Sequence, residues 1–315
     1  MTDILNEDGV KQDSFRAWLL AARPKTLAGA AVPVMIGIAF CYADAQLYGW
    51  NIFSWKPALL CLLFALIMQI DANFINDFYD YARGNDDETR LGPKRACAQG
   101  WVSIDAMKKA IALTTVTACA VGLPLIIYGG LEMIAVGILC VVFCFLYTTH
   151  LSYIGLGDLL VVVFFGIVPV CITYYVQLHT ITWPLFWASI ACGLVIDNLL
   201  MINNFRDIQN DRKSGKITLV ARAGLSRSAK IYLALGFIAC MLNILMWTRD
   251  GRMWAFLLPL LYLIPHYLTW REMVKIKRGK ALNKILGKTA RNIFIYGLLT
   301  AGGIICSLML ANYSN

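Results

Sequence analysis

Long apolar stretches separated by short polar connections dominate this chain, and the pattern predicts nine membrane-spanning helices. A transmembrane helix needs roughly 20 mainly apolar residues to cross a hydrocarbon core of ~30 Å. The expected fold is therefore an all-α integral membrane bundle, with residues 1–315 forming one membrane-embedded domain. The apolar stretches are expected at about residues 26–44, 57–76, 109–128, 131–147, 157–178, 184–204, 229–247, 254–269 and 293–312.

The composition supports a membrane protein and excludes a large soluble helical protein. Hydrophobic residues make up 59% of the chain and charged residues only 15%, whereas roughly a quarter of the residues in a soluble domain are charged. The ten cysteines form no Cys-x-x-Cys motif and no Cys/His pairing, so the sequence indicates neither a zinc site nor a disulfide framework. The formal net charge of +9 is better explained by membrane topology than by binding to nucleic acid.

The basic residues lie almost entirely on one side of the predicted membrane. Nearly all of the 28 lysines and arginines fall in the N-terminal region or in and next to the connections 81–108, 205–228 and 270–292. Cytoplasmic loops are rich in lysine and arginine, so we predict that the N-terminal segment 1–21 and these connections are cytoplasmic. With nine spans, the C-terminus then lies outside. The exceptions are Lys56, Arg249 and Arg252.

Two acidic segments follow long apolar stretches on the same predicted side of the membrane. Carboxylates are costly in hydrocarbon, so clusters of them at membrane-helix ends indicate a functional site. Each segment contains an Asn-x-x-x-Asp unit, Asn73 to Asp77 and Asn203 to Asp207, which indicates a weak internal repeat. If the two segments face each other, they form one shared site. They read Asn73-Phe-Ile-Asn76-Asp77-Phe-Tyr-Asp80 and Asn203-Asn204-Phe-Arg206-Asp207-Ile-Gln-Asn210-Asp211.

The spacing within each acidic segment predicts a site for a divalent cation. Positions i, i+3 and i+4 share one face of a helix, so carboxylates at these positions repel each other unless a cation lies between them. Mg²⁺ prefers oxygen ligands and is typically held by one or two carboxylates together with substrate phosphates. The alternative is that these polar residues only mark the membrane boundary. The predicted Mg²⁺ ligands and catalytic residues are Asp77, Asp80, Asp207 and Asp211, and the predicted neutral donors are Asn73, Asn76 and Asn204.

Basic residues near both acidic segments predict a binding site for a diphosphate. Arginine and lysine neutralise the charge that builds on the oxygens of a leaving diphosphate. The alternative is the topological bias alone, which we favour for 270–292, where the lysines are expected to contact anionic membrane lipid. The predicted diphosphate-binding cations are Arg23, Lys25, Lys94, Arg95, Arg206 and Lys216.

Further polar residues are candidates for binding an acceptor. Asp71 and Asp197 lie deeper in the second and sixth apolar stretches, where they could bind a polar head group or pair with another polar residue. Tyr147 and Tyr153 are candidate donors to the same group, or aromatic residues of the membrane interface. Asp158 begins the fifth stretch and is interpreted as an acid in the first turn of its helix.

Strings of residues around these segments add a resemblance to a known family. They are Ala22-Arg-Pro-Lys-Thr-Leu27, Tyr81 with Gly84-Asn-Asp86, Gly92-Pro-Lys-Arg95, Tyr153-Ile-Gly-Leu-Gly-Asp158, Phe164-Phe-Gly166 and Gly215-Lys-Ile-Thr-Leu219. With the two acidic segments, the chain resembles the UbiA superfamily of intramembrane prenyltransferases. The flanking strings look most like the branch that uses 1,4-dihydroxy-2-naphthoate in menaquinone biosynthesis. The chain departs from similar enzymes after Tyr147-Thr148, where they often carry Gly-Gly-Pro.

The resemblance implies a fold, an activity and a location. The fold is a nine-helix bundle around a central cavity, with Mg²⁺ and the diphosphate at its cytoplasmic rim and the prenyl tail in an apolar channel open to lipid. The activity is Mg²⁺-dependent transfer of a polyprenyl group from polyprenyl diphosphate to dihydroxynaphthoate, with loss of CO₂ and diphosphate, giving demethylmenaquinone. The location is the inner membrane of a bacterium, with the active site facing the cytoplasm.

Two other interpretations remain open at the level of the sequence. One is a UbiA-type prenyltransferase that uses another aromatic acceptor, such as 4-hydroxybenzoate. The other is a cation-coupled membrane transporter, which would also contain intramembrane acids and prolines in its helices. Transporters place their coupling acids near the membrane midplane, whereas the clustered acids of this chain follow the apolar stretches and lie beside basic connections. This placement favours the enzyme.

Overall fold

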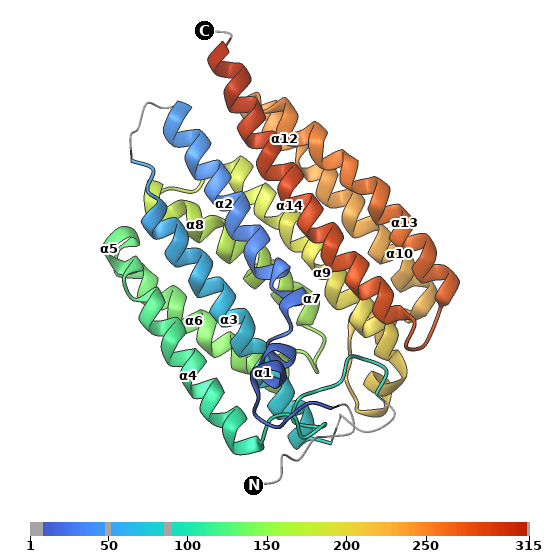
Figure 1. Cartoon of the computed structure of the whole chain (residues 1–315). Coiled ribbons are helices and arrows are strands. Elements are labelled where there is room, and N and C mark those ends of the chain that lie inside the picture. Colours follow the sequence, from blue (N-terminus) through green and yellow to red (C-terminus); the bar gives the residue numbers. More distant parts are fainter. Residues whose placement is uncertain (1–8, 48–51, 85–89, 314–315) are drawn as a thin grey trace.

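The computed structural model of the chain describes residues 9–47, 52–84 and 90–313. Within these residues the protein is a bundle of helices, nine of which are long and apolar enough to cross a membrane, as predicted (Figure 1). The spans are α2 (Ala28–Leu47), α3 (Trp55–Ala82), α4 (Ile104–Gly122) with α5 (Leu125–Gly129), α6 (Glu132–Leu146), α7 (Gly157–Val162) with α8 (Val168–Leu178), α9 (Trp183–Lys213), α10 (Leu219–Leu242) with α11 (Ile244–Asp250), α12 (Met253–Leu257) with α13 (Leu263–Ile276), and α14 (Leu282–Tyr313).

Several helices extend beyond the apolar stretches that predicted them. α3 continues past residue 76 and α9 past residue 204, so both acidic segments lie entirely inside helices. α10, α13 and α14 also extend beyond their predicted stretches, so the connections 214–218 and 277–281 are much shorter than the loops predicted at 205–228 and 270–292. The reason is that hydropathy reports where lipid contact ends, whereas a helix continues as long as its polar side chains find partners in the bundle. The orientation of the termini stays a prediction from the distribution of charge.

α9 is the central helix of the bundle. It packs against α2, α7, α10 and α14, while α3 packs mainly on α4 (Figure 1). The largest buried apolar cluster joins α2, α8, α9 and α14 and contains fully buried side chains such as Phe40, Leu185 and Tyr296. The short helix α1 (Phe15–Ala22) packs Ala17 and Ala21 into a separate cluster with Phe74 of α3. α3 and α9 therefore belong to different packing groups.

Two glycines let the fifth span approach α9 closely. Gly166 lies in the π-helical turn Val163–Ile167 between α7 and α8, and a methyl group on it would lie 2.5 Å from the carbonyl oxygen of Ser189. A methyl group on Gly193 would lie 2.8 Å from the carbonyl oxygen of Val162. Small residues at such crossings let membrane helices pack backbone to backbone. This crossing fixes the α7–α8 span against the second acidic helix.

A buried ion pair joins three spans at the end of the bundle opposite the acidic segments. Arg252, which precedes α12, donates to the Asp44 carboxylate of α2 and lies 5.1 Å over the ring of Phe40. The Tyr174 hydroxyl of α8 donates to the other Asp44 oxygen at 2.7 Å. Asp44 is 3% exposed and Arg252 5% exposed. The pair therefore replaces hydration for both charges.

We expect removal of one partner of this pair to destabilise the protein more than replacement of both. Asp44→Asn removes the buried carboxylate that Arg252 pairs with and so breaks a buried ion pair from one side, which costs on the order of 3–5 kcal/mol. The double variant Asp44→Leu/Arg252→Met removes both charges and should lose less. Thermal unfolding in detergent measures the stability of the single and the double variant. The signal is the reaction of a thiol dye with cysteines that are buried until the protein unfolds. A double variant as unstable as Asp44→Asn would contradict this account of the pair.

Candidate functional site

A large cavity lies between the two halves of the bundle. Its volume is about 1080 Å³, and its walls come mainly from α2 to α9, with further residues from α1, α14 and the polar connections. Both acidic segments line it at one end, although they are far apart in the sequence. The side chains from these segments that line the cavity are Asn73, Asn76, Asp80, Asn203, Asn204, Arg206, Asp207, Asn210 and Asp211. The predicted shared polar site is therefore one continuous surface.

The other end of the cavity is apolar. Phe64 and Met68 of α3 face this part together with Phe164 and Ile172 from the fifth span. Leu123, which is 65% exposed, and Ile138, which is 58% exposed, also line it. Because these two residues lie both on the cavity and on the outer surface, the apolar end reaches the lipid-facing side of α4 and α6. The cavity thus combines a polar end with an apolar end that borders lipid.

In the first acidic helix, α3, the asparagine and aspartate that line the cavity together are not the pair inferred from the sequence. Asn76 and Asp80 of α3 line the cavity at the same four-residue spacing as Asn203 and Asp207 of α9. The sequence paired Asn73 with Asp77 instead, because α3 offers two overlapping Asn-x-x-x-Asp units three residues apart. Asn73 also lines the cavity, but Asp77 does not, and only packing decides which of the two aspartates turns toward it.

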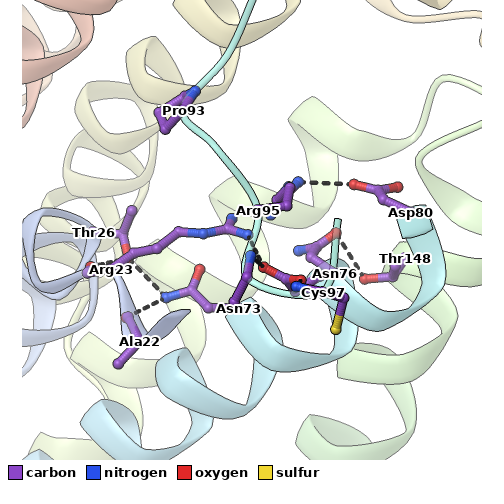
Figure 2. A network of polar contacts seen from close by, with 12 residues as sticks. Ala22, Arg23, Thr26, Asn73, Asn76, Asp80, Pro93, Arg95, Cys97 and Thr148 are labelled. Atoms are coloured by element: carbon purple, nitrogen blue, oxygen red, sulfur yellow. Dashed lines mark hydrogen bonds and ion pairs between the residues drawn. The ribbon is translucent and has the colours of Figure 1, made fainter. Parts of the chain in front are cut away.

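Asp77 does not line the cavity and instead holds a loop. It is 1% exposed, and its carboxylate accepts hydrogen bonds from the backbone N–H groups of Ala96 and Cys97, each at 2.9 Å. Arg23 approaches the same carboxylate at 3.5 Å. Figure 2 shows Arg95 and Cys97 on the loop segment beside α3. Asp77, predicted as a metal ligand, therefore uses both oxygens to position the segment that carries Arg95.

Asn73 ties the α1–α2 connection to α3 (Figure 2). Its side-chain N–H group donates to the Ala22 carbonyl at 2.9 Å and to the Thr26 hydroxyl at 3.0 Å. Arg23 and Lys25, which lie between these partners in the sequence, line the cavity. The predicted donor Asn73 thus brings two predicted cations to the polar end.

The cavity-lining carboxylates differ in their partners. Asp80 accepts from Arg95 at 2.8 Å, and Asp207 is bound through both oxygens by Arg206, at 2.8 and 2.5 Å. Asp211 is 8% exposed, and its Oδ2 has no hydrogen-bond partner among the described residues. Lys216 lies close enough to Asp80 and Asp211 for their charges to interact.

The polar end has a donor set that suits Mg²⁺ arriving with a phosphate ligand. In the described part of the chain, no three Asp, Glu, His or Cys side chains form a ready metal cluster. Mg²⁺ does not need one, because one or two carboxylates and substrate phosphates usually suffice. The buried oxygen of Asp211 lacks a donor within hydrogen-bond distance, and Asn76 and Asn203, whose side chains carry amide oxygens, line the same space. These oxygen donors fit the predicted cofactor.

Five of the six predicted diphosphate-binding cations line the cavity, and Lys94 does not. Lys94 is exposed on the loop. Sequence reasoning missed Arg90, Asn203, Asn210 and Lys213 as cavity residues. The sequence did contain a signal for Asn203, because Asn203 is the first residue of the second Asn-x-x-x-Asp unit. The five predicted cations that line the cavity are Arg23, Lys25, Arg95, Arg206 and Lys216.

The candidate acceptor residues divide into two groups. Tyr147 and Tyr153 line the cavity. Asp71 does not; it is fully buried and accepts from the hydroxyls of Thr114 and Thr115 of α4, the latter at 2.8 Å. Asp197 is 3% exposed and does not line the cavity either. Asp71 therefore pairs with polar residues of a neighbouring helix, as the second interpretation of these acids predicted.

Two parts of the sequence predictions lie outside the described residues. They are residues 1–8 of the N-terminal segment and Asn85-Asp86 of the string after Gly84. Asp158 lies in the first turn of α7, as interpreted from the sequence.

Asp77 and Asp211 are expected to differ in what their removal does. Asp77→Ala removes the acceptor of two backbone N–H groups, so the loop should open and Cys97, which is 6% exposed, should react with a water-soluble maleimide about tenfold faster. Asp211→Ala should leave this rate unchanged. Mass spectrometry of the peptide that contains Cys97 gives the rate. Equal Cys97 labelling in Asp77→Ala and the unaltered protein would show that Asp77 does not hold the loop.

Comparisons with known proteins agree with this architecture. The model of the UbiA prenyltransferase family matches residues 30–298. The chain is 34% identical over 314 residues to the 1,4-dihydroxy-2-naphthoate octaprenyltransferase of Escherichia coli (strain K12), covering 93% of this chain and 96% of that protein. It is 31% identical to the enzyme of that name from Mycobacterium tuberculosis, covering 92% and 97% of the two chains.

Solved structures share the fold at lower identity. An apo UbiA homologue from Aeropyrum pernix K1 superposes with a TM-score of 0.63 at 17% identity, covering 87% of this chain and 97% of that one. A UbiA homologue from Archaeoglobus fulgidus bound to DMAPP and Mg²⁺ gives a TM-score of 0.60 at 14% identity, covering 90% and 99% of the two chains. The match of the family model over most of the chain decides the assignment: this protein belongs to the UbiA prenyltransferase family.

Proposed function

We propose that this protein transfers a polyprenyl group from polyprenyl diphosphate to 1,4-dihydroxy-2-naphthoate, releasing CO₂ and diphosphate and forming demethylmenaquinone. The observation that carries the proposal is the cavity, whose polar end joins the two acidic helices and whose apolar end borders lipid. A prenyl diphosphate has the same division into a charged head and an apolar tail. The relatives named as naphthoate octaprenyltransferases support the choice of acceptor.

The polar end supplies the groups that a diphosphate needs. Asp80, Asp207 and Asp211 would hold Mg²⁺, and Asn76 with Asn203 would add neutral oxygens. When bound there, Mg²⁺ neutralises negative charge on the diphosphate oxygens. We assign Asp77 to the loop that carries Arg95 instead, because its oxygens are already bonded to backbone N–H groups.

The chain's cations stabilise the leaving group, and its apolar residues protect the reactive carbon. Arg95, Arg206 and Lys216 line the polar end and balance the charge that builds on the diphosphate as the allylic C–O bond breaks. The apolar walls exclude water from the resulting carbocation. The ring carbon of the naphthoate that carries the carboxyl group attacks this cation, and CO₂ leaves in place of a ring proton. No strong base is therefore needed to remove a C–H proton.

The charge distribution and the relatives also support a location. The concentration of lysines and arginines in these connections supports a cytoplasmic N-terminus and a polar end of the cavity that faces the cytoplasm. The named naphthoate octaprenyltransferases come from bacteria, and the nine spans require a membrane. We propose the bacterial inner membrane, with the acceptor entering from the cytoplasmic side past Tyr147 and Tyr153.

A transfer assay on the purified protein in lipid tests this function. With a long polyprenyl diphosphate and Mg²⁺, we expect product and an equivalent amount of CO₂ from dihydroxynaphthoate, and little product from 4-hydroxybenzoate. Product from hydroxybenzoate alone would replace the acceptor while keeping the enzyme class. The absence of transfer to either compound would contradict the proposal and reopen the transporter.

Asp211→Asn tests the proposed cation ligand. This change preserves the shape of the side chain but removes the charge of a cavity carboxylate that has a buried oxygen without a hydrogen-bond partner among the described residues. We expect the Mg²⁺ concentration for half-maximal rate to rise and the rate at saturation to fall about 10²-fold. Glu272→Gln, on α13 and away from the cavity lining, is the matched control. An unchanged Mg²⁺ dependence in Asp211→Asn would remove Asp211 from the ligand set.

A further inference from the structure

Arg83 connects the end of the first acidic helix to the short connection between the fourth and fifth spans. It caps α3, one turn after Asp80. Its guanidinium donates to the backbone carbonyls of Thr148 and Thr149, at 3.0 and 2.7 Å. The guanidinium carbon also lies 4.9 Å from the centre of the Tyr153 ring. Arg83 does not itself line the cavity.

The segment that Arg83 holds forms part of the cavity wall. Thr148 and Thr149 belong to the π-helical turn Tyr147–Leu151, which follows directly on α6. Carbonyls at the end of a helix lack intrahelical partners, and Arg83 supplies donors to two of them. Tyr147, Thr148 and Tyr153 line the cavity at its polar end. In addition, the Thr148 hydroxyl donates to the amide oxygen of Asn76 at 3.2 Å (Figure 2).

The same segment contacts the connection that follows the second acidic helix, α9. The backbone N–H of Ile217 donates to the Tyr153 carbonyl at 2.8 Å, and the Lys216 ammonium lies 5.7 Å from the centre of the Tyr153 ring. Residues 147–153 therefore bridge the two halves of the site at its polar end. Their position relative to α3 is set by the Thr148–Asn76 contact and by the two hydrogen bonds from Arg83.

We propose that Arg83 is a positioning residue that holds this wall closed to water, so that the carbocation reacts with the acceptor ring instead of with water. This inference rests on the proposed prenyl transfer. Without Arg83, two backbone carbonyls lose their donors, and water is the nearest replacement because an unsatisfied carbonyl recruits a hydrogen-bond partner. That water would lie in the wall beside Tyr147 and Thr148.

Water and acceptor compete for the same carbon. When the allylic C–O bond breaks, its electron pair leaves with the diphosphate, and the carbon becomes the electron acceptor. A pair from the naphthoate ring forms a C–C bond, and CO₂ then departs. A pair from a water oxygen forms a C–O bond, and one proton passes to the solvent, leaving a prenyl alcohol. The ratio of prenyl alcohol to prenylated product therefore measures access of water to the site.

This ratio separates positioning from mere stabilisation of the fold. A variant that only unfolds more easily has fewer active molecules, but each active molecule still divides the carbocation between the ring and water as before. A variant with an opened wall changes the division at every turnover. The ratio is independent of the amount of folded enzyme once hydrolysis in an enzyme-free blank is subtracted.

The experiment compares Arg83→Gln and Arg83→Lys with the unaltered protein in lipid, using dihydroxynaphthoate and polyprenyl diphosphate. Arg271→Gln is the matched control, because Arg271 is an exposed arginine whose guanidinium lies 5.9 Å over the Tyr267 ring of α13, away from the cavity lining. We expect the alcohol-to-product ratio to rise about tenfold in Arg83→Gln, because charge-assisted hydrogen bonds to the wall are lost. Arg83→Lys, which keeps the charge, should give a smaller rise, and Arg271→Gln none.

An unchanged ratio in Arg83→Gln, with only a lower yield, would overturn the inference. If Arg83→Gln cannot be purified, the ratio of Arg83→Lys decides alone, and a value equal to that of the unaltered protein overturns it. Failure of the unaltered protein to prenylate either acceptor would instead refute the proposed function, which makes the two failures distinguishable.

Discussion

A charge inside a membrane span must be paired or bonded, and this constraint organises the molecule. Asp44 is paired with Arg252 and bonded to Tyr174. Asp71 is bonded to two threonines of α4, and Asp77 to two backbone N–H groups. Each of these acids therefore joins separate segments. The contacts of these carboxylates, which are costly to bury, fix how the helices are aligned with one another.

The same constraint locates the site. Asp80 and Asp207 are balanced by arginines rather than by neutral donors, and Asp211 keeps an oxygen without a hydrogen-bond partner among the described residues. These three carboxylates line the large cavity to which both halves of the bundle contribute. Their charge is thus available to a cation that arrives with a diphosphate, whereas Asp44, Asp71 and Asp77 each use both oxygens in contacts within the bundle. Polar connections add to this arrangement, since the loop held by Asp77 and the turn held by Arg83 deliver side chains to the polar end.

Much of this arrangement was accessible from the sequence, and the errors have physical causes. The nine spans followed from hydropathy, because length and apolar content alone decide whether a helix can cross a membrane. The helix ends did not, since α3 and α9 continue through polar residues that hydropathy scores as loop. Asp77 and Asp80 could not be separated, because both fit an Asn-x-x-x-Asp unit on one helix and only its rotation distinguishes them. The two interpretations of Asp71, binding the acceptor or pairing with another polar residue, stayed open because its partners Thr114 and Thr115 are more than forty residues away in the sequence.

The number of spans, the clustering of acids and cations at matching helix ends, and the family resemblance can all be read from the sequence, because they depend on local composition and spacing. Helix packing sets which face of each acidic helix meets the cavity, which acids form contacts within the bundle, and how residues 147–153 bridge the two halves. These features escape the sequence because the role of a side chain depends on its partners, and in this bundle the partners lie on helices that are far apart along the chain.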